Sequence, residues 1–148
     1  MDDLPRMSEL KNQGYYCSQI LLMLDLEMRG KSNPDLVRAM QGLAGGIGFT
    51  GLTCGVLTGA ACWLGLYAGK GTSTDEDDPR LIFMTEDLVR WFQQTWGERF
   101  GGIDCDDILA NGVGRMANRC AEITLETRQK VKEILVENGF DLWMDRDG

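Results

Sequence analysis

The chain has 148 residues, a length typical of one domain, and its 43% hydrophobic and 26% charged residues are ordinary for a globular protein. Fifteen basic and 23 acidic residues give a net charge of −8, which disfavours binding to phosphate backbones, so we expect no nucleic-acid partner. Histidine is absent, which excludes Ser-His-Asp and Cys-His catalysis and any histidine-ligated zinc or haem. Carboxylates, tyrosines, lysines and five cysteines remain as reactive groups.

The first predicted helix covers residues 17–28, between Gly14 and Gly30. Its apolar side chains recur at three- and four-residue intervals and therefore share one face. They are Cys17, Ile20, Leu21, Leu24 and Met28. A second helix is predicted over 34–40, because Ser32-Asn33-Pro34-Asp35 supplies a polar cap, then a proline, then an acid.

A glycine-rich turn is expected over 42–51. Thr53 is the expected cap of a third helix that ends near Ala68. The segment 69–79 is small, polar and acidic, which predicts a surface loop.

Three more helices are predicted after Pro79. The first reaches Gly101-Gly102, and a short one begins after Asp104. The last starts near Met116 and ends at Asn138-Gly139. Its apolar stripe consists of Cys120, Ile123, Thr127, Val131, Ile134 and Leu135.

The tail, residues 139–148, carries apolar residues and is expected to dock on the helices. No run of alternating apolar and polar residues and no internal repeat is present. The pattern predicts an all-α fold: a single-domain helical bundle of about five to six helices over residues 1–148.

Residues 39–69 form a stretch of 31 residues without a charged side chain, longer than the roughly 20 that a membrane-spanning helix needs. Nine of them are glycine, and the dense apolar part, 56–68, has only 13 residues. That length favours a buried core helix over a membrane span.

Two glycine patterns occur in this stretch. Gly46-Ile47-Gly48-Phe49-Thr50-Gly51 fits GxGxxG, but a dinucleotide site needs a preceding strand, and here a helix precedes it. We therefore expect a turn between helices that uses positive φ angles. Gly51, Gly55 and Gly59 are spaced by four, which predicts a helix face that packs closely against another backbone.

The cysteines are Cys17, Cys54, Cys62, Cys105 and Cys120, without a CxxC pair. Cys17, Cys54 and Cys105 each fall in the first turn of a predicted helix, where the helix dipole favours a thiolate. This position predicts a thiol pKa below the free value of about 8.5. Because Asp104, Asp106 and Asp107 oppose a thiolate at Cys105, Cys54 is expected to be the more reactive of the two, unless Val56 and the glycine packing bury it. Cys62, in mid-helix, is expected to pack in the core.

The same residues resemble a small redox-active family that is named for a C…CGAxxG…C…C pattern. Cys17, Cys105 and Cys120 match its single cysteines, and Cys54-Gly55-Val56-Leu57-Thr58-Gly59 matches its motif. Val56 departs from the pattern, which has alanine there, and its added bulk is expected to narrow access to Cys54. Cys62 lies outside the pattern. The resemblance implies redox activity as a proposal, since the family name describes a pattern and not a reaction.

The sequence thus predicts a four-cysteine site at Cys17, Cys54, Cys105 and Cys120. Three interpretations stay open: thiol–disulfide exchange or electron transfer, binding of an iron–sulfur cluster or zinc by the same four cysteines, or a structural or adaptor protein whose cysteines only pack. The substrate and the redox partner are not determined.

Two expectations concern the cellular location and the oligomeric state of the protein. The start Met1-Asp2-Asp3 lacks the features of a signal peptide, and the odd cysteine count is unlike that of a secreted disulfide scaffold, so we expect a cytoplasmic location. Four tryptophans, Trp63, Trp91, Trp96 and Trp143, together with the glycine-lined helix, favour a homodimer.

Overall fold

The computed structural model describes residues 3–109 and 116–142, whose regular elements are helices with no β-strand. The all-α prediction is confirmed. The α-helices are α1 (Leu4–Asn12), α2 (Cys17–Met28), α3 (Pro34–Met40), α4 (Gly55–Ala68), α5 (Arg80–Phe92), α6 (Glu98–Phe100), α7 (Cys105–Leu109) and α8 (Met116–Glu137). A 3-10 turn, Gln41–Leu43, follows α3.

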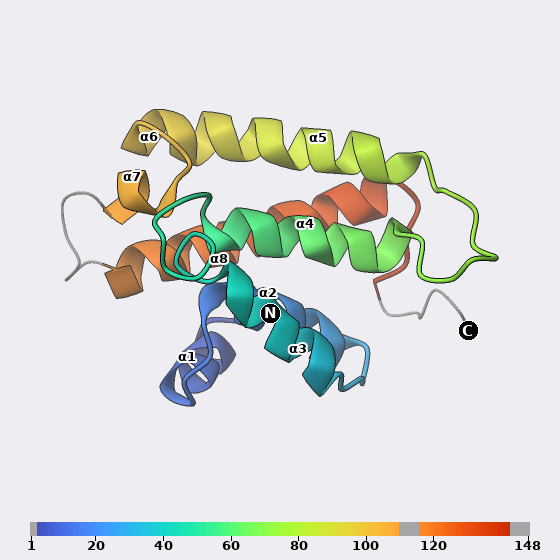
Figure 1. Ribbon diagram of the computed structural model, residues 1–148, viewed down its shortest axis with the longest axis horizontal. Coiled ribbons are helices and arrows are strands. Elements are labelled where there is room, and N and C mark those ends of the chain that lie inside the picture. The colour runs from blue at the N-terminus through green and yellow to red at the C-terminus, as the bar shows by residue number, and fades with distance from the viewer. Residues whose placement is uncertain (1–2, 110–115, 143–148) are drawn as a thin grey trace.

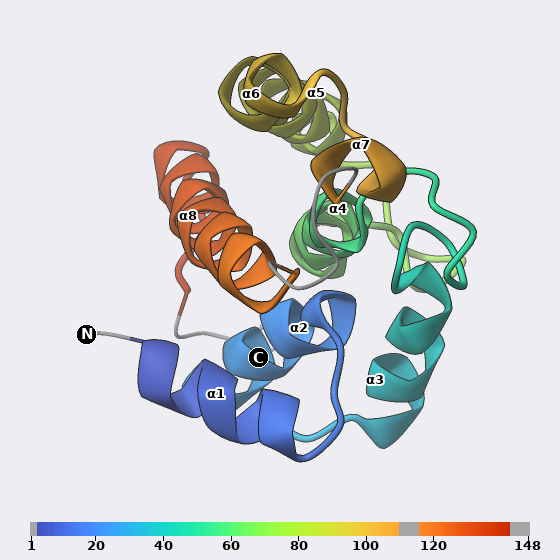
Figure 2. The same ribbon diagram turned by 90° about the vertical axis from the view of Figure 1, so that its left-hand side faces the viewer.

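Helix α4 is the centre of the bundle and contacts α2, α5 and α8 (Figures 1 and 2). Trp63 and Leu64, in the middle of α4, have no exposed surface. The α4 part of the uncharged stretch therefore lies in the core of the domain, where an unpaired charge would be costly. No helix in the described ranges is long and apolar enough to span a bilayer.

Helix α2 is buried on more sides than its sequence predicts. Ile20 and Leu24 pack with α1, as expected from the predicted stripe. Leu22 and Leu26, outside that stripe, pack with Met40 of α3. A helix covered on several faces has no single apolar stripe, which explains why periodicity described only part of it.

Helix α1 was not predicted from the sequence. Its apolar residues, Leu4, Met7 and Leu10, are few, and polar side chains separate them. Met7 and Leu10 nevertheless pack into a cluster with Ile20 and Leu24. Pro5 in the first turn was the available sequence signal for a helix start.

The other predicted boundaries agree with the structure to within one or two residues. Helix α4 begins after Cys54 rather than Thr53, so Cys54 is its N-cap residue. Helix α5 continues through a π turn, Gln93–Gly97, into α6 and ends at Gly101, whose φ is 81°. Residues 69–79 contain no helix and are mostly exposed. Of the tail, Phe140 and Leu142 pack against the main core, and residues 143–148 lie outside the described part.

The tryptophans give less support to a dimer than the sequence suggested. Trp63 and Trp96 are 0% and 1% exposed and fill the core of one chain. Trp91 is half-buried, and Trp143 lies outside the described residues. The homodimer stays a prediction.

The glycine pattern in α4 has the predicted effect at two of its three positions. A Cβ on Gly55 would lie 2.8 Å from the carbonyl oxygen of Leu43, and one on Gly59 would lie 3.2 Å from the backbone of Ser18. Gly51 precedes the helix and is not part of this face, contrary to the prediction. The two helical glycines allow α4 to approach its neighbours closely.

This close packing predicts that adding a side chain at Gly55 lowers the free energy of unfolding. We expect Gly55→Ala to lower the free energy of unfolding by about 1–3 kcal/mol, because the new Cβ collides with a backbone atom. Gly65→Ala in the same helix is the matched control: a Cβ there meets no atom within 4 Å. It should raise stability by about 0.5–1 kcal/mol through helix propensity. Urea denaturation of both variants measures the difference, and equal effects of the two would contradict the packing argument.

Candidate functional site

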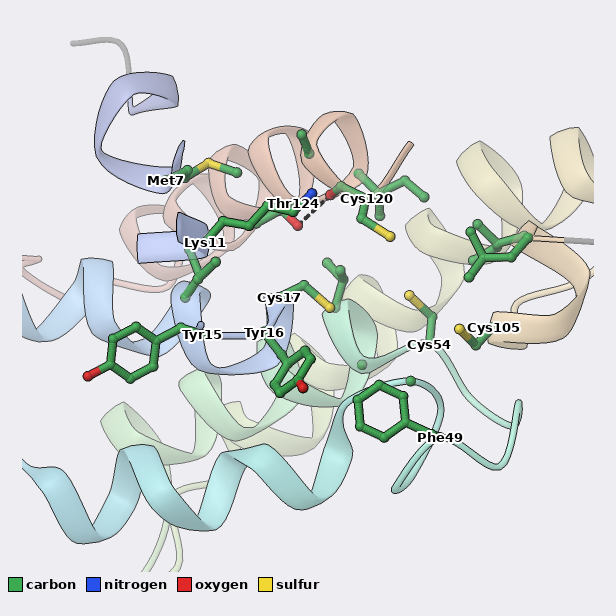
Figure 3. Close-up of a pocket in the computed structure, with 18 of the residues that line it drawn as sticks. Met7, Lys11, Tyr15, Tyr16, Cys17, Phe49, Cys54, Cys105, Cys120 and Thr124 are labelled. Atoms are coloured by element: carbon green, nitrogen blue, oxygen red, sulfur yellow. Dashed lines mark hydrogen bonds between the residues drawn. The ribbon is translucent and has the colours of Figure 1, made fainter. Parts of the chain in front are cut away.

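Helix starts bring four cysteines to one end of the bundle. Cys17 is the first residue of α2, Cys54 caps α4, Cys105 is the first residue of α7, and Cys120 lies near the start of α8. Figure 2 views this end of the molecule. All four side chains line one cavity of about 680 Å³, which we call the cysteine cavity (Figure 3). Cys62 does not line it.

A short backbone bridge holds Cys54 and Cys105 in register. Thr53 and Asp104 form an isolated antiparallel bridge. On either side of it, the Cys54 N–H donates to Ile103 O at 3.0 Å, and the Cys105 N–H donates to Leu52 O at 2.6 Å. The two cysteines are therefore diagonal neighbours on the same face of the bridge. Cα atoms in that relation lie roughly 7–8 Å apart, slightly beyond the distance of about 7 Å that a disulfide allows.

The loop before this bridge has an unusual left-handed turn. Five consecutive residues, 45–49, have φ between 62° and 74°, including the non-glycine residues Ile47 and Phe49. The expected turn with positive φ angles is confirmed at Gly46, Gly48 and Gly51, and a helix precedes it. Such angles cost of order 1–3 kcal/mol at a non-glycine residue, and they recur at functional sites.

The left-handed turn places Phe49 at the edge of the cavity. The Phe49 ring meets the Tyr16 ring edge-to-face, with 5.2 Å between centroids, and both line the cavity (Figure 3). Phe49 is 61% exposed and Tyr16 is 40% exposed. Two aromatic rings thus flank the approach to the sulfur atoms while remaining open to solvent.

The cavity wall is mostly apolar. Met7, Ile20, Val56 and Ile123 are among its lining residues. Of the lining residues in the described ranges, only Lys11 and Asp106 carry charge. Sequence reasoning missed Lys11, Tyr16 and Phe49, because they belong to an unpredicted helix, a cap and a loop.

Burial raises the thiol pKa values at the two most enclosed sulfur atoms. It raises the pKa of Cys17 most strongly, and negative charge on Cys54, Cys120 and Cys105 raises it further. It raises the pKa of Cys54 from 9.0 to about 11, although the N–H groups of Val56 and Leu57 at the start of α4 act in the opposite direction. The predicted lowering by helix starts is therefore present but outweighed by desolvation, and the expected pKa values below 8.5 are wrong.

The exposure of Cys54 and Cys105 meets the exception named for the expected order of reactivity, namely burial of Cys54. Cys54 is only 7% exposed, whereas Cys105 is half-buried. Burial and the charge of Asp106 raise the pKa of Cys105, and burial raises that of Cys120, by less than at Cys17 and Cys54. Cys105 is thus the more accessible nucleophile. Cys62 is exposed, so the expectation that it packs in the core is wrong.

The raised thiol pKa of Cys54 predicts a loss of stability in alkali. The folded state holds this proton more tightly than the unfolded state, so the stabilisation is complete below pH 9 and is lost as the pH rises toward 11. The two-unit difference corresponds to at most about 2–3 kcal/mol. Urea denaturation under reducing conditions from pH 8 to 11 should show a steeper decline for the wild type than for Cys54→Ser. Parallel pH curves would contradict the prediction.

The spread of the four cysteines bears on metal binding. A zinc ion or an iron–sulfur cluster needs convergent thiolates, with Zn–S distances near 2.3 Å. Within the described ranges, no three cysteine, aspartate or glutamate side chains form a group that could hold a metal ion. The sulfur atoms surround a cavity rather than a point, so this arrangement does not fit a metal centre.

Comparisons with known proteins connect these cysteines to one family. A family model described as "Putative redox-active protein (C_GCAxxG_C_C)" matches residues 15–134, a range that contains all four cavity cysteines. The motif in that name reads GCAxxG, whereas the resemblance was stated for CGAxxG. With the motif cysteine at Cys54, its alanine falls at Gly55, so the departure predicted at Val56 is wrong. Searches of curated proteins and of solved structures find no match.

Proposed function

Because the chain belongs to the C_GCAxxG_C_C family, we propose that its cysteine cavity carries out thiol–disulfide exchange. The observation that carries the proposal is that four cysteines from distant parts of the chain line one cavity (Figure 3). Four separate packing cysteines have no physical reason to share a cavity that is open to solvent. All five cysteines are free thiols, the state from which such a reaction begins.

In the proposed reaction, Cys105 attacks first. Its thiolate forms a bond with one sulfur of a substrate disulfide, and the other substrate sulfur leaves and takes a proton. Cys54 then attacks the Cys105 sulfur, and the second substrate thiol leaves with a proton. Two cysteine thiols are oxidised to one disulfide, and one substrate disulfide is reduced to two thiols.

The assignment of roles follows from exposure and the bridge. Cys105 is the more accessible of the pair, whereas Cys54 is buried. A buried resolving cysteine needs little thiolate, because its target is held beside it and the effective concentration is high. The Thr53–Asp104 bridge holds the two cysteines near one another, and a small backbone shift that brings their Cα atoms within about 7 Å closes the disulfide.

Thiol counting tests the proposed function. Reduced Cys62→Ser protein is treated with bis(2-hydroxyethyl) disulfide, which is small and uncharged. We expect two thiols lost and two mercaptoethanol molecules released per chain. Retention of all four thiols, or stable mixed disulfides without a second release, would refute the proposal. Anaerobic purification with stoichiometric iron or zinc would instead favour a metal-binding role.

The same proposal includes a cellular location and an oligomeric state. The odd number of cysteines, unlike the dense even set of a secreted disulfide scaffold, supports a cytoplasmic location. A homodimer would cover apolar surface that is exposed on α5, where Ile82 is 70% and Phe83 is 62% exposed. Light scattering distinguishes a dimer from a monomer of 16.5 kDa.

A further inference from the structure

The cysteine cavity has the size and lining of a small-molecule site. Its volume of about 680 Å³ lies within the roughly 300–1,000 Å³ that is usual for such sites. A mostly apolar wall holds an aliphatic body well, and a concave site is poorly accessible to a disulfide inside a folded protein. These features concern the substrate, which the proposed exchange reaction leaves undetermined.

A cationic side chain, Lys11, is part of the otherwise mostly apolar wall of the cysteine cavity. Lys11, in the last turn of α1, extends along the cavity toward Cys120 and Thr124 (Figure 3). Its positive charge opposes the burial-driven rise in the pKa of Cys120, so the ammonium lies within electrostatic reach of that sulfur. No carboxylate in the described part of the chain forms an ion pair with Lys11, although Arg6, five residues earlier in α1, pairs with both Glu9 and Glu27.

The second charged residue of the wall has the opposite sign. Asp106 follows Cys105 at the start of α7, and its carboxylate raises the pKa of the Cys105 thiol. An anionic group is therefore favoured beside Lys11 and disfavoured near Cys105. A ligand with several charged groups would leave most of them desolvated and unpaired against the apolar wall.

Taking these observations together, we infer that the cysteine cavity binds a small aliphatic disulfide or dithiol that carries a single carboxylate, with the carboxylate at Lys11 and the sulfur atoms toward Cys105 and Cys54. This inference rests on the proposed thiol–disulfide exchange and names its substrate class. Lipoate, a cyclic disulfide on an aliphatic carboxylate, is a probe of this class.

The reaction with lipoate balances without another reactant. The Cys105 thiolate attacks one ring sulfur, the ring S–S bond breaks, and the released sulfur takes a proton. Cys54 then attacks Cys105, and the second lipoate sulfur leaves with a proton. Lipoate gains two electrons and two protons, and the two cysteines lose them; the relative potentials of the two couples set the direction.

Carboxylate binding is tested without any redox chemistry. Octanoate and its neutral amide, octanamide, lack sulfur and are titrated by calorimetry into reduced Cys62→Ser protein. In that background, Lys11→Gln should weaken octanoate binding roughly two- to fivefold, as expected for the loss of a charge pair at an exposed ammonium, and leave octanamide binding unchanged. Lys70→Gln, at an exposed lysine in the 69–79 loop, is the matched control and should change neither. Equal octanoate affinity in all three proteins would overturn the inference.

Disulfide specificity separates this inference from the proposed function. Reduced Cys62→Ser protein should react faster with lipoate than with glutathione disulfide, which is highly charged, or with the disulfides of insulin. If all three oxidise the cavity cysteines at equal rates, thiol–disulfide exchange stands and the substrate class is wrong. If none does while octanoate binding depends on Lys11, the exchange reaction is wrong and the carboxylate site stands.

Discussion

In the Cys62→Ser background, Cys105→Ser is expected to slow oxidation of the cavity by bis(2-hydroxyethyl) disulfide about tenfold or more. With Cys105 absent, a more buried thiol must attack. At Cys54, a pKa near 11 instead of 9.0 lowers the thiolate fraction at neutral pH about 100-fold relative to an unperturbed thiol, whereas the pKa of Cys105 is raised by less. The greater nucleophilicity of a more basic thiolate recovers about tenfold of this loss, and restricted access adds to the remainder.

The Cys62→Ser variant is the control for this experiment. Cys62 is exposed and outside the cavity, so Cys62→Ser alone should leave oxidation of the cavity cysteines unchanged. Cys54→Ser should still react once, through Cys105, but stop at the mixed disulfide. Stopped-flow measurement of thiol release resolves both steps. Equal rates with and without Cys105 would show that another thiol attacks first.

The largest expected effect on stability comes from Asp25→Ala. Asp25 has no exposed surface, and its carboxylate accepts a hydrogen bond from the Tyr67 hydroxyl at 2.7 Å and from Arg29 Nη2 at 2.8 Å. Arg29 is itself 6% exposed, so removing the carboxylate deprives a buried guanidinium of this ion pair. Breaking a buried pair in this way typically costs about 3–5 kcal/mol.

Asp35→Ala is the matched control for this prediction. Asp35 pairs with Arg38 at 2.7 Å, but the two side chains are 95% and 73% exposed. Exposed pairs contribute about 0–1 kcal/mol, so this variant should unfold close to the wild type. Urea denaturation at pH 7 compares the two, and similar losses would mean that the Asp25–Arg29–Tyr67 contacts contribute little.

Local sequence signals predicted most of the helices because those signals act locally. Pro34 after Asn33 begins α3, and the Asn33 side chain accepts a hydrogen bond from the Leu36 N–H, as a cap should. The stripe of α8 is buried at Ile123, Thr127, Val131, Ile134 and Leu135. Helix α1 was not predicted because three apolar residues among many polar ones give a weak periodic signal.

The four cysteines were identified from the sequence, but their electrostatics could not be. A helix start predicts a lowered thiol pKa, yet the pKa depends more on burial, which is set by side chains far away in sequence. Lys11 and Phe49 belong to the cavity only because α1 and the left-handed turn fold over it. Their roles required the three-dimensional arrangement.

Disulfide mapping of the oxidised protein tests the central claim most directly. Cys62→Ser protein is oxidised with bis(2-hydroxyethyl) disulfide, its remaining thiols are alkylated at low pH, and the tryptic peptides are identified by mass spectrometry. The account predicts one linked peptide pair that joins Cys54 to Cys105, with Cys17 and Cys120 alkylated. If no disulfide joins any two cavity cysteines under these conditions, the cavity does not carry out thiol–disulfide exchange.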